Sequence, residues 1–385
     1  MKNTLQLKLY QFIKNHSLEE KRILIAVSAG LDSMALLNLF IGLKERLNLD
    51  LHVVHVHHGW RKESDEEFRF LEDYSRKNGI GFSGTLLNLN SDSADCENKA
   101  REARYTFFRQ VYETLEADGL FLAHHKQDLE ETVVKRLYEG AHLINLGCMQ
   151  KSSKLGPMQL FRPLLEINKK TLIKYVEEVK IPYFEDHTNS DPKFLRTRLR
   201  QDFFPSLEKI FGKKKGESLS FLSQEAQLLH TYFEKRFDKE VLVTHPSSLN
   251  QAIYFPKTLE FFEIYHFLLI FFKRQSLTVS RDILQNLSEA VEDSTSPKNF
   301  ILKAFSLMAS KNFCVLIFEE KTDLLEHNSD DLNKALWIYE DRAGMDLEKL
   351  PNWFYNKVPT LRSKNKFFLN YYPSFTNETK YIRLI

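Results

Sequence analysis

Cysteine is scarce in this chain: Cys96, Cys148 and Cys314 stand far apart among 385 residues. They form no CxxC pair, so we expect neither a zinc site nor an iron–sulfur cluster built on such pairs. The first residues alternate charged and apolar side chains and contain no signal-peptide core. An odd number of cysteines without a secretory leader fits a reducing compartment, and we expect the protein in the cytoplasm.

Long hydrophobic runs are also missing. The most apolar stretch, residues 261–272, is interrupted by Glu263 and His266. It is shorter than the roughly 18 residues that a membrane-spanning helix needs, so it predicts a buried helix and no membrane partner. The formal net charge is only +2. A surface that binds nucleic-acid phosphates must therefore concentrate its positive charge locally.

The composition is that of a folded chain, with 43% hydrophobic and 28% charged residues. The first half alternates strand-like and helix-like periods. This alternation favours an α/β domain with a doubly wound parallel sheet covered on both faces. The expected strands are residues 23–27, 51–56, 82–87 and 119–123, and the expected helices are residues 34–43, 64–78 and 97–116.

The length predicts more than one domain. Three lysines between Gly212 and Gly216 read as a linker, and residues 294–298 read as a second break. We therefore expect an α/β domain over residues 1–211 and a helical domain over residues 217–292. A small α+β domain is expected over residues 298–385, with strand-like segments at residues 313–318 and 366–371.

The most informative segment is a small-residue loop between the first expected strand and the first expected helix. Small residues let the backbone approach an anion, and free N–H groups at a helix start point toward it. Two serine hydroxyls can donate hydrogen bonds, and a carboxylate in the loop can hold magnesium. A capped strand-to-helix turn is the alternative, and no GxxxxGK[ST] Walker loop is present. The residues are Val27, Ser28, Ala29, Gly30, Leu31, Asp32 and Ser33.

This loop resembles the SGGxDS signature of the PP-loop ATP pyrophosphatases, which cleave ATP between its α- and β-phosphates to adenylate a substrate. The chain departs from the signature at Ala29, where glycine is usual. Alanine disfavours a positive φ. We therefore expect residue 29 to lie outside the left-handed region.

Further stretches resemble one branch of that superfamily, the tRNA(Ile)-lysidine synthases. Each has an ordinary alternative as a packed histidine, a solvated helix face or a carboxylate at a helix start, but they occur in order over nearly two hundred residues. The resemblance is weak in the helical middle and returns faintly near the end. The stretches are residues 55–59 (HVHHG), 97–108 (ENKAREARYTFF), 123–132 (AHHKQDLEET), 185–191 (EDHTNSD) with the arginines that follow, and 350–359 (LPNWFYNKVP). The departures are Gln127, Leu129, Thr197 and Gln201.

The resemblance implies a ligase that uses ATP and Mg²⁺. It adenylates C2 of cytidine 34 in tRNA(Ile) with a CAU anticodon, and the ε-amine of free lysine then displaces AMP to give lysidine. Codon reading changes from AUG to AUA. The implied catalytic residues are Asp32, Arg101, Arg104, Asp128 and Glu131, with Asp32 as the candidate magnesium ligand. The implied ATP-binding residues are Ser28, Ala29, Gly30, Leu31, Asp32, Ser33, His57, His124 and His125.

The tRNA must be recognised as a folded object, because one anticodon base cannot identify it. Positively charged side chains would bind its phosphates in a salt-dependent way. The resemblance implies that residues 1–211 form the catalytic domain and that the domains over residues 217–292 and 298–385 bind tRNA. A homodimer is compatible with the same resemblance. The expected tRNA-binding residues are Arg196, Arg198, Arg200, Lys213, Lys214, Lys215, Lys357 and Arg362.

Three alternatives remain at this point. One is another PP-loop enzyme, although a thiolase would need cysteine pairs and a GMP synthetase a glutaminase domain. The second is a catalytically degenerate PP-loop protein that binds RNA, which Ala29, Gln127, Leu129 and Thr197 suggest. The third is a generic flavodoxin-like protein with an unrelated C-terminal domain.

Overall fold

The computed structural model describes residues 2–57, 63–87, 96–185, 195–212, 217–244, 251–294, 298–302, 305–318, 337–339, 367–368 and 381–384. The chain divides into two compact units, Met1–Leu228 and Leu229–Ile385, and each is described by itself. The three-domain division expected from the sequence stays a prediction.

The first unit is built on a six-stranded sheet of order β3-β2-β1-β4-β6-β5. All neighbours in it are parallel except β5 and β6, which form an antiparallel hairpin at one edge. The mostly parallel sheet confirms the expected fold class, and the antiparallel hairpin is an addition that the sequence pattern did not indicate. The strands are β1 (Arg22–Ala26), β2 (Asp50–His57), β3 (Gly81–Leu86), β4 (Gly119–Phe121), β5 (Ser152–Leu155) and β6 (Met158–Phe161).

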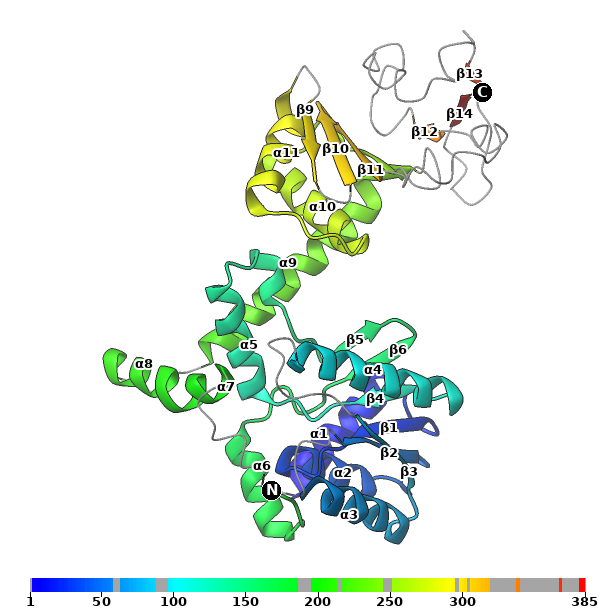
Figure 1. Ribbon diagram of the computed structural model, residues 1–385, viewed down its shortest axis with the longest axis vertical. Helices are drawn as coiled ribbons and strands as arrows, with labels where there is room; N and C mark the ends of the chain where they lie inside the picture. The colour runs from blue at the N-terminus through cyan, green and yellow to red at the C-terminus, as the bar shows by residue number, and fades with distance from the viewer. Residues whose placement is uncertain are drawn as a thin grey trace. The chain divides into compact units, whose positions relative to one another are not determined.

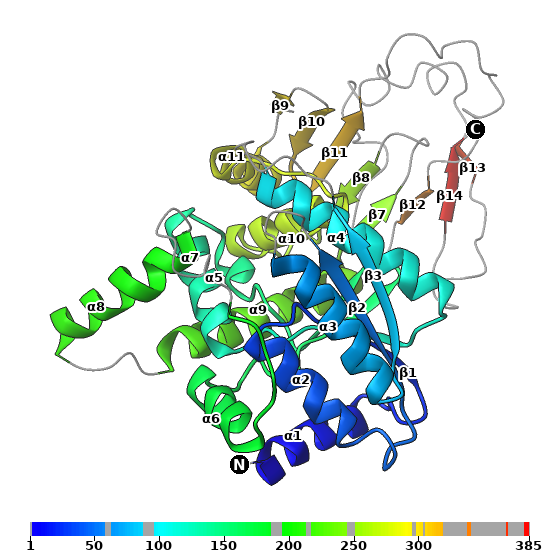
Figure 2. The ribbon, with the colours of Figure 1, turned by 60° about the horizontal axis from the view of Figure 1, so that its bottom comes forward.

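Both faces of this sheet are buried, as a doubly wound arrangement requires. Strand β1 shows the alternation: Ile23 and Ile25 belong to one apolar cluster, whereas Leu24 belongs to the other. The first cluster includes side chains of α1, α2, α3 and α6, and the second includes Tyr105 and Phe108 of α4. Figures 1 and 2 show α4 across the sheet from α2 and α3. These helices are α1 (Lys2–Asn15), α2 (Leu31–Ile41), α3 (Glu63–Lys77), α4 (Cys96–Thr114) and α6 (Lys169–Val179).

The remaining helical elements of the first unit follow either β4 or α6 in the chain. They include a π-helical turn, Leu199–Phe203, between two short helices. The helix α5 follows β4 directly, which places its first turn at the same edge as the loop after β1. The elements are α5 (Lys126–Tyr138), a 3₁₀ turn (Leu143–Leu146), α7 (Leu195–Arg198), α8 (Phe204–Phe211) and the start of α9 (Ser218–Glu240).

The second unit combines helices with an antiparallel sheet of order β7-β8-β11-β10-β9. The expected helical character is confirmed in α9, α10 and α11, and the apolar stretch from residue 261 forms α10 with Phe267 and Phe271 fully buried. The short strands β7 and β8 were not predicted. The elements are α10 (Phe261–Arg274), α11 (Arg281–Asp293), β7 (Leu242–Thr244), β8 (Gln251–Tyr254), β9 (Lys298–Ile301), β10 (Phe305–Ser310) and β11 (Phe313–Phe318).

After β11 the structure describes three short strands, β12 (Trp337–Tyr339), β13 (Phe367–Phe368) and β14 (Tyr381–Leu384), which pair antiparallel in the order β12-β14-β13. The C-terminal motif around residues 350–359 lies outside the described residues, as do Lys357 and Arg362. Within the ranges described, no helix is both long enough and apolar enough to cross a membrane.

Candidate nucleotide and carboxylate site

The loop after β1 is closed by its own hydroxyl groups. The Ser28 backbone N–H donates to Ser33 Oγ at 3.1 Å, and Ser33 Oγ donates to the Gly30 carbonyl oxygen at 2.9 Å. Gly30 is the N-cap of α2 and has no side chain to accept from the first turn. The first N–H groups of α2 are therefore directed toward a site where an anion can accept from them.

Ala29 has a φ of 62°, so it lies in the left-handed region, and the expectation that it would not is wrong. The residue is fully buried, and its carbonyl oxygen accepts from the Phe184 N–H at 3.0 Å. A left-handed conformation costs an L-residue roughly 1–2 kcal/mol. Burial and this backbone bond hold the loop in the shape that a glycine would adopt without that cost.

His55, on β2, contacts the backbone at the start of the loop. Its Nδ1 lies 2.7 Å from the Val27 carbonyl oxygen, and the ring is buried. Burial lowers the pKa of His55, which keeps the imidazole neutral. The next histidine along the strand, His57, is also buried and contacts Asp65 at 3.1 Å through Nε2. His55 is thus a structural support for the phosphate loop that the sequence motif contained without an assigned role.

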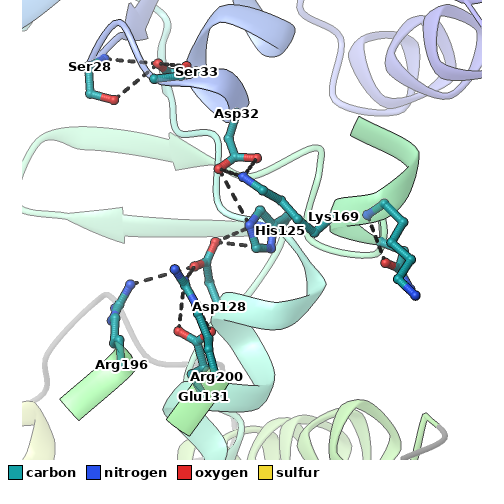
Figure 3. A network of polar contacts seen from close by, with 12 residues as sticks. Ser28, Asp32, Ser33, His125, Asp128, Glu131, Lys169, Arg196 and Arg200 are labelled. Carbon is teal, nitrogen blue, oxygen red and sulfur yellow. Dashed lines mark hydrogen bonds and ion pairs between the residues drawn. The ribbon is translucent and has the colours of Figure 1, made fainter. Parts of the chain in front are cut away.

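Asp32, in the first turn of α2, meets a partner that the sequence analysis missed. Both of its carboxylate oxygens accept from Lys169 Nζ, at 2.7 and 2.6 Å (Figure 3). On its other side, His125 Nε2 lies 3.6 Å from Asp32 Oδ2. A signal was present in the sequence: Lys169 and Lys170 open α6, where the helix dipole disfavours cations.

The first turn of α5 carries the second half of the site. The His125 backbone N–H donates to Asp128 Oδ2 at 2.9 Å, so Asp128 closes the start of the helix. Burial by itself would raise the pKa of Asp128, but His125, this backbone bond and nearby positive charges hold it below its ordinary value. Burial lowers the pKa of the neighbouring His124 to about 4, with Arg162 and Arg196 acting in the same direction. Asp128 is therefore ionised and His124 neutral near pH 7.

Two carboxylates of α5 share one guanidinium. Arg200 Nε donates to Glu131 Oε1 at 2.5 Å, and Arg200 Nη2 lies 3.1 Å from Glu131 Oε2 and 3.3 Å from Asp128 Oδ1 (Figure 3). Glu131 is only 1% exposed. Burial disfavours the charge of Arg200, but its bonds to Glu131 outweigh that effect and raise its pKa. Arg196 is a looser partner, 3.7 Å from Asp128 and about half exposed.

The structure connects six of the predicted site residues in one network, and several others have different contacts. The connected residues are Asp32, His125, Asp128, Glu131, Arg196 and Arg200. The guanidinium groups of Arg101 and Arg104 on α4 lie 4.9 and 5.9 Å from the centre of the Tyr105 ring. Arg198 lines an apolar groove of about 1010 Å³ together with Leu195 and Leu199. The short segment 195–200 thus directs alternate arginines to different places. Lys213, Lys214 and Lys215 lie outside the described residues.

The donor set is compatible with a magnesium ion that is bound jointly by protein and nucleotide. Among the residues described, no three His, Cys, Asp or Glu side chains form a cluster that could hold a metal by themselves. Mg²⁺ is usually bound through one or two carboxylates and the phosphates of the nucleotide. Asp32, at the start of α2, provides a carboxylate of this kind.

Comparison with known proteins agrees with this geometry. A family model described as a PP-loop domain matches residues 1–207. The tRNA(Ile)-lysidine synthase of Chlamydia pneumoniae is 42% identical over 218 residues, which cover 56% of this chain and 67% of that protein. The tRNA(Ile)-lysidine synthase of Chlamydia caviae is 36% identical over 276 residues, which cover 71% of this chain and 86% of that protein.

A solved structure shows the same fold at low sequence identity. The U34-tRNA thiolase NcsA from Methanococcus maripaludis, determined with its [4Fe-4S] cluster, superimposes with a TM-score of 0.50 and 16% identity. The match covers 59% of this chain and 78% of that chain. Together with the phosphate loop and the relatives above, it leaves one conclusion: this chain belongs to the PP-loop family and, within it, to the tRNA(Ile)-lysidine synthases.

Proposed function

We propose that this protein adenylates the C2 oxygen of cytidine 34 in tRNA(Ile) with a CAU anticodon and then joins lysine to C2. In the first step the C2 oxygen attacks the α-phosphorus of ATP and pyrophosphate leaves. In the second step the lysine ε-amine attacks C2, the C2 oxygen departs with AMP, and the amine loses its proton. The product, lysidine, reads AUA rather than AUG. The observation that carries this proposal is that His125 links Asp32 to Asp128, and Arg200 links Asp128 to Glu131, beside the phosphate loop.

The loop after β1 would bind the pyrophosphate part of ATP. The Ser28 N–H and the Ser33 hydroxyl bond to loop atoms and hold the loop closed, and the N–H groups that follow Gly30 would donate to the phosphates. Asp32 would hold Mg²⁺, which supplies positive charge as pyrophosphate departs. His57, His124 and His125 are proposed to lie near the nucleotide. Ala29 and Leu31 would contribute their backbone.

The carboxylates of α5 would bind and deprotonate the lysine amine. Glu131 is buried and tightly held by Arg200, whereas Asp128 has the looser partner Arg196. The lysine ammonium can replace Arg196 at Asp128 without uncovering a buried charge. Because Asp128 stays ionised, it can attract the ammonium, and the same carboxylate is proposed to accept a proton from it.

The remaining arginines and lysines are proposed to contact the RNA. Arg101 or Arg104 would neutralise the transferring phosphoryl group or anchor the cytosine. Phosphate contacts are proposed for Arg198, Lys213, Lys214, Lys215, Lys357 and Arg362. Arg196 and Arg200, which were expected among them, contact carboxylates of α5 instead. The reaction is proposed to take place in the cytoplasm. A homodimer is compatible with this scheme.

Pyrophosphate exchange separates this proposal from an RNA-binding protein without catalysis. Labelled pyrophosphate should enter ATP only when tRNA(Ile) with C34 is present, since exchange requires reversible adenylation of that base. Asp32→Ala should abolish the exchange, and Asp282→Ala, at an exposed carboxylate on α11, should not. Binding of ATP and tRNA by the wild type without any exchange would favour the non-catalytic alternative.

A further inference from the structure

Lys169 occupies a position that the proposed roles do not explain. Its ammonium group contacts both oxygens of Asp32, and each of the two side chains is 29% exposed. A ligand that arrives from solvent can therefore reach the pair. We propose that Lys169 binds the β- and γ-phosphates of ATP, while Asp32 exchanges this ammonium for the magnesium ion. The inference rests on the proposed function, because it assumes that ATP is the ligand of the loop.

The ends of three helices meet at this position. Helix α2 begins at Leu31, α5 at Lys126 and α6 at Lys169. The Lys126 backbone N–H donates to the Ile167 carbonyl oxygen at 3.1 Å, which fixes the start of α5 beside the start of α6. The positive ends of helix dipoles favour anions at such a place. The local field therefore suits a polyphosphate.

A lysine in the first turn of a helix is unfavourable without an anion beside it. Asp32 is the anion that Lys169 contacts in the structure. The ammonium of lysine is a compact charge on a flexible stem, which suits it to move a short distance between a carboxylate and a phosphate. It would then add one positive charge beside Asp32, at the start of α2. Lys170, the next residue, is exposed and serves as a matched control.

Calorimetric titration of the full chain with Mg²⁺–ATP and with AMP tests this assignment. Lys169→Met should weaken ATP binding by about ten- to a hundredfold, the range for hydrogen bonds to charged groups. AMP binding should stay within about twofold, because AMP lacks the β- and γ-phosphates. Lys169→Arg should retain most of the ATP affinity, and Lys170→Met should match the wild type.

Loss of the ammonium also leaves Asp32 without its partner, so a second pair of variants guards against misfolding. Asp32→Asn should bind metal-free ATP more tightly than the wild type does, since Lys169 no longer has to leave a carboxylate. The double variant Asp32→Asn/Lys169→Met should lose that gain. Equal metal-free affinity in the single and double Asp32 variants would overturn the inference.

Other results would overturn it as well. Unchanged ATP affinity in Lys169→Met would contradict it. An equal loss of ATP and AMP affinity would also contradict it, because Lys169 would then only stabilise the packing of α6 against α2. A wild-type protein that does not bind ATP would also contradict it. A wild-type protein that binds ATP through Lys169 but forms no lysidine would contradict the proposed function alone.

Discussion

Among single residues, Ala29 combines a left-handed backbone with a fully buried methyl group. Replacement by glycine removes a conformational cost of roughly 1–2 kcal/mol. It also removes a buried methyl worth about 0.8 kcal/mol and adds about 0.5–1 kcal/mol of unfolded-chain entropy. These terms nearly cancel, so Ala29→Gly should change the free energy of unfolding by less than about 0.5 kcal/mol in urea denaturation.

Ala29→Val is the informative comparison. A β-branched residue is a poor fit to a positive φ, and the extra methyl groups have no room at a fully buried position. We expect a loss of about 2 kcal/mol or more in the same measurement. Equal stabilities of the glycine and valine variants would show that residue 29 is not strained.

His124 gives the site a pH dependence whose direction follows from its environment. Burial, with Arg162 and Arg196 acting in the same direction, lowers its pKa to about 4 in the folded protein, against an ordinary value of about 6.5 in the unfolded chain. The unfolded chain therefore binds the proton first, and stability falls as pH falls from about 6.5 toward about 4.

The variant His124→Asn cannot take up this proton. Between pH 7 and pH 5 the wild type should lose about 1–2 kcal/mol more stability than His124→Asn does. Urea denaturation at the two pH values measures the difference, and the other histidines cancel because both proteins contain them. Parallel pH profiles for the two proteins would mean that His124 is not held neutral by the fold.

At the scale of secondary-structure elements, Arg200 fastens the π-helical turn after α7 to the first turns of α5. Arg200→Gln leaves Glu131, which is almost fully buried, without its cation. We expect a loss of about 1–3 kcal/mol in the free energy of unfolding. Arg196→Gln, which removes the looser and half-exposed partner of Asp128, should cost less.

A double-mutant cycle isolates this pair. Glu131→Gln in the Arg200→Gln background should recover part of the lost stability, because the unpaired charge is then removed. Strict additivity of the two single losses would contradict the assigned ion pair.

The sequence predicts the elements whose side chains are buried by simple periodic patterns. Strand β1 is a nearly continuous apolar run, and β2 is buried along most of its length, because both faces of the sheet are covered. Strand β5 could not be predicted from an apolar period, because its four residues are polar or exposed at the sheet edge. Strands β7 and β8 are three and four residues long, too short for a period to be read.

Across the whole molecule, the part of the site that is contiguous in sequence was predicted, and the contacts between residues distant in sequence were not. The loop around Ser28 and Asp32 is contiguous in sequence, so its chemistry can be predicted locally. The Asp32–Lys169 pair joins residues 137 positions apart, and the Glu131–Arg200 pair joins residues 69 positions apart. A single sequence does not report which distant charges meet. The arginines expected to face tRNA phosphates accordingly include two that the fold directs at carboxylates.

Covalent incorporation of labelled lysine into tRNA tests the central claim most directly. The full chain is incubated with ATP, Mg²⁺ and transcripts of tRNA(Ile) that carry either C34 or U34, with Asp32→Ala as a control. The account predicts label on the C34 transcript alone, and none with Asp32→Ala. Label on the U34 transcript, or no label on either transcript with a protein that binds ATP, would contradict it.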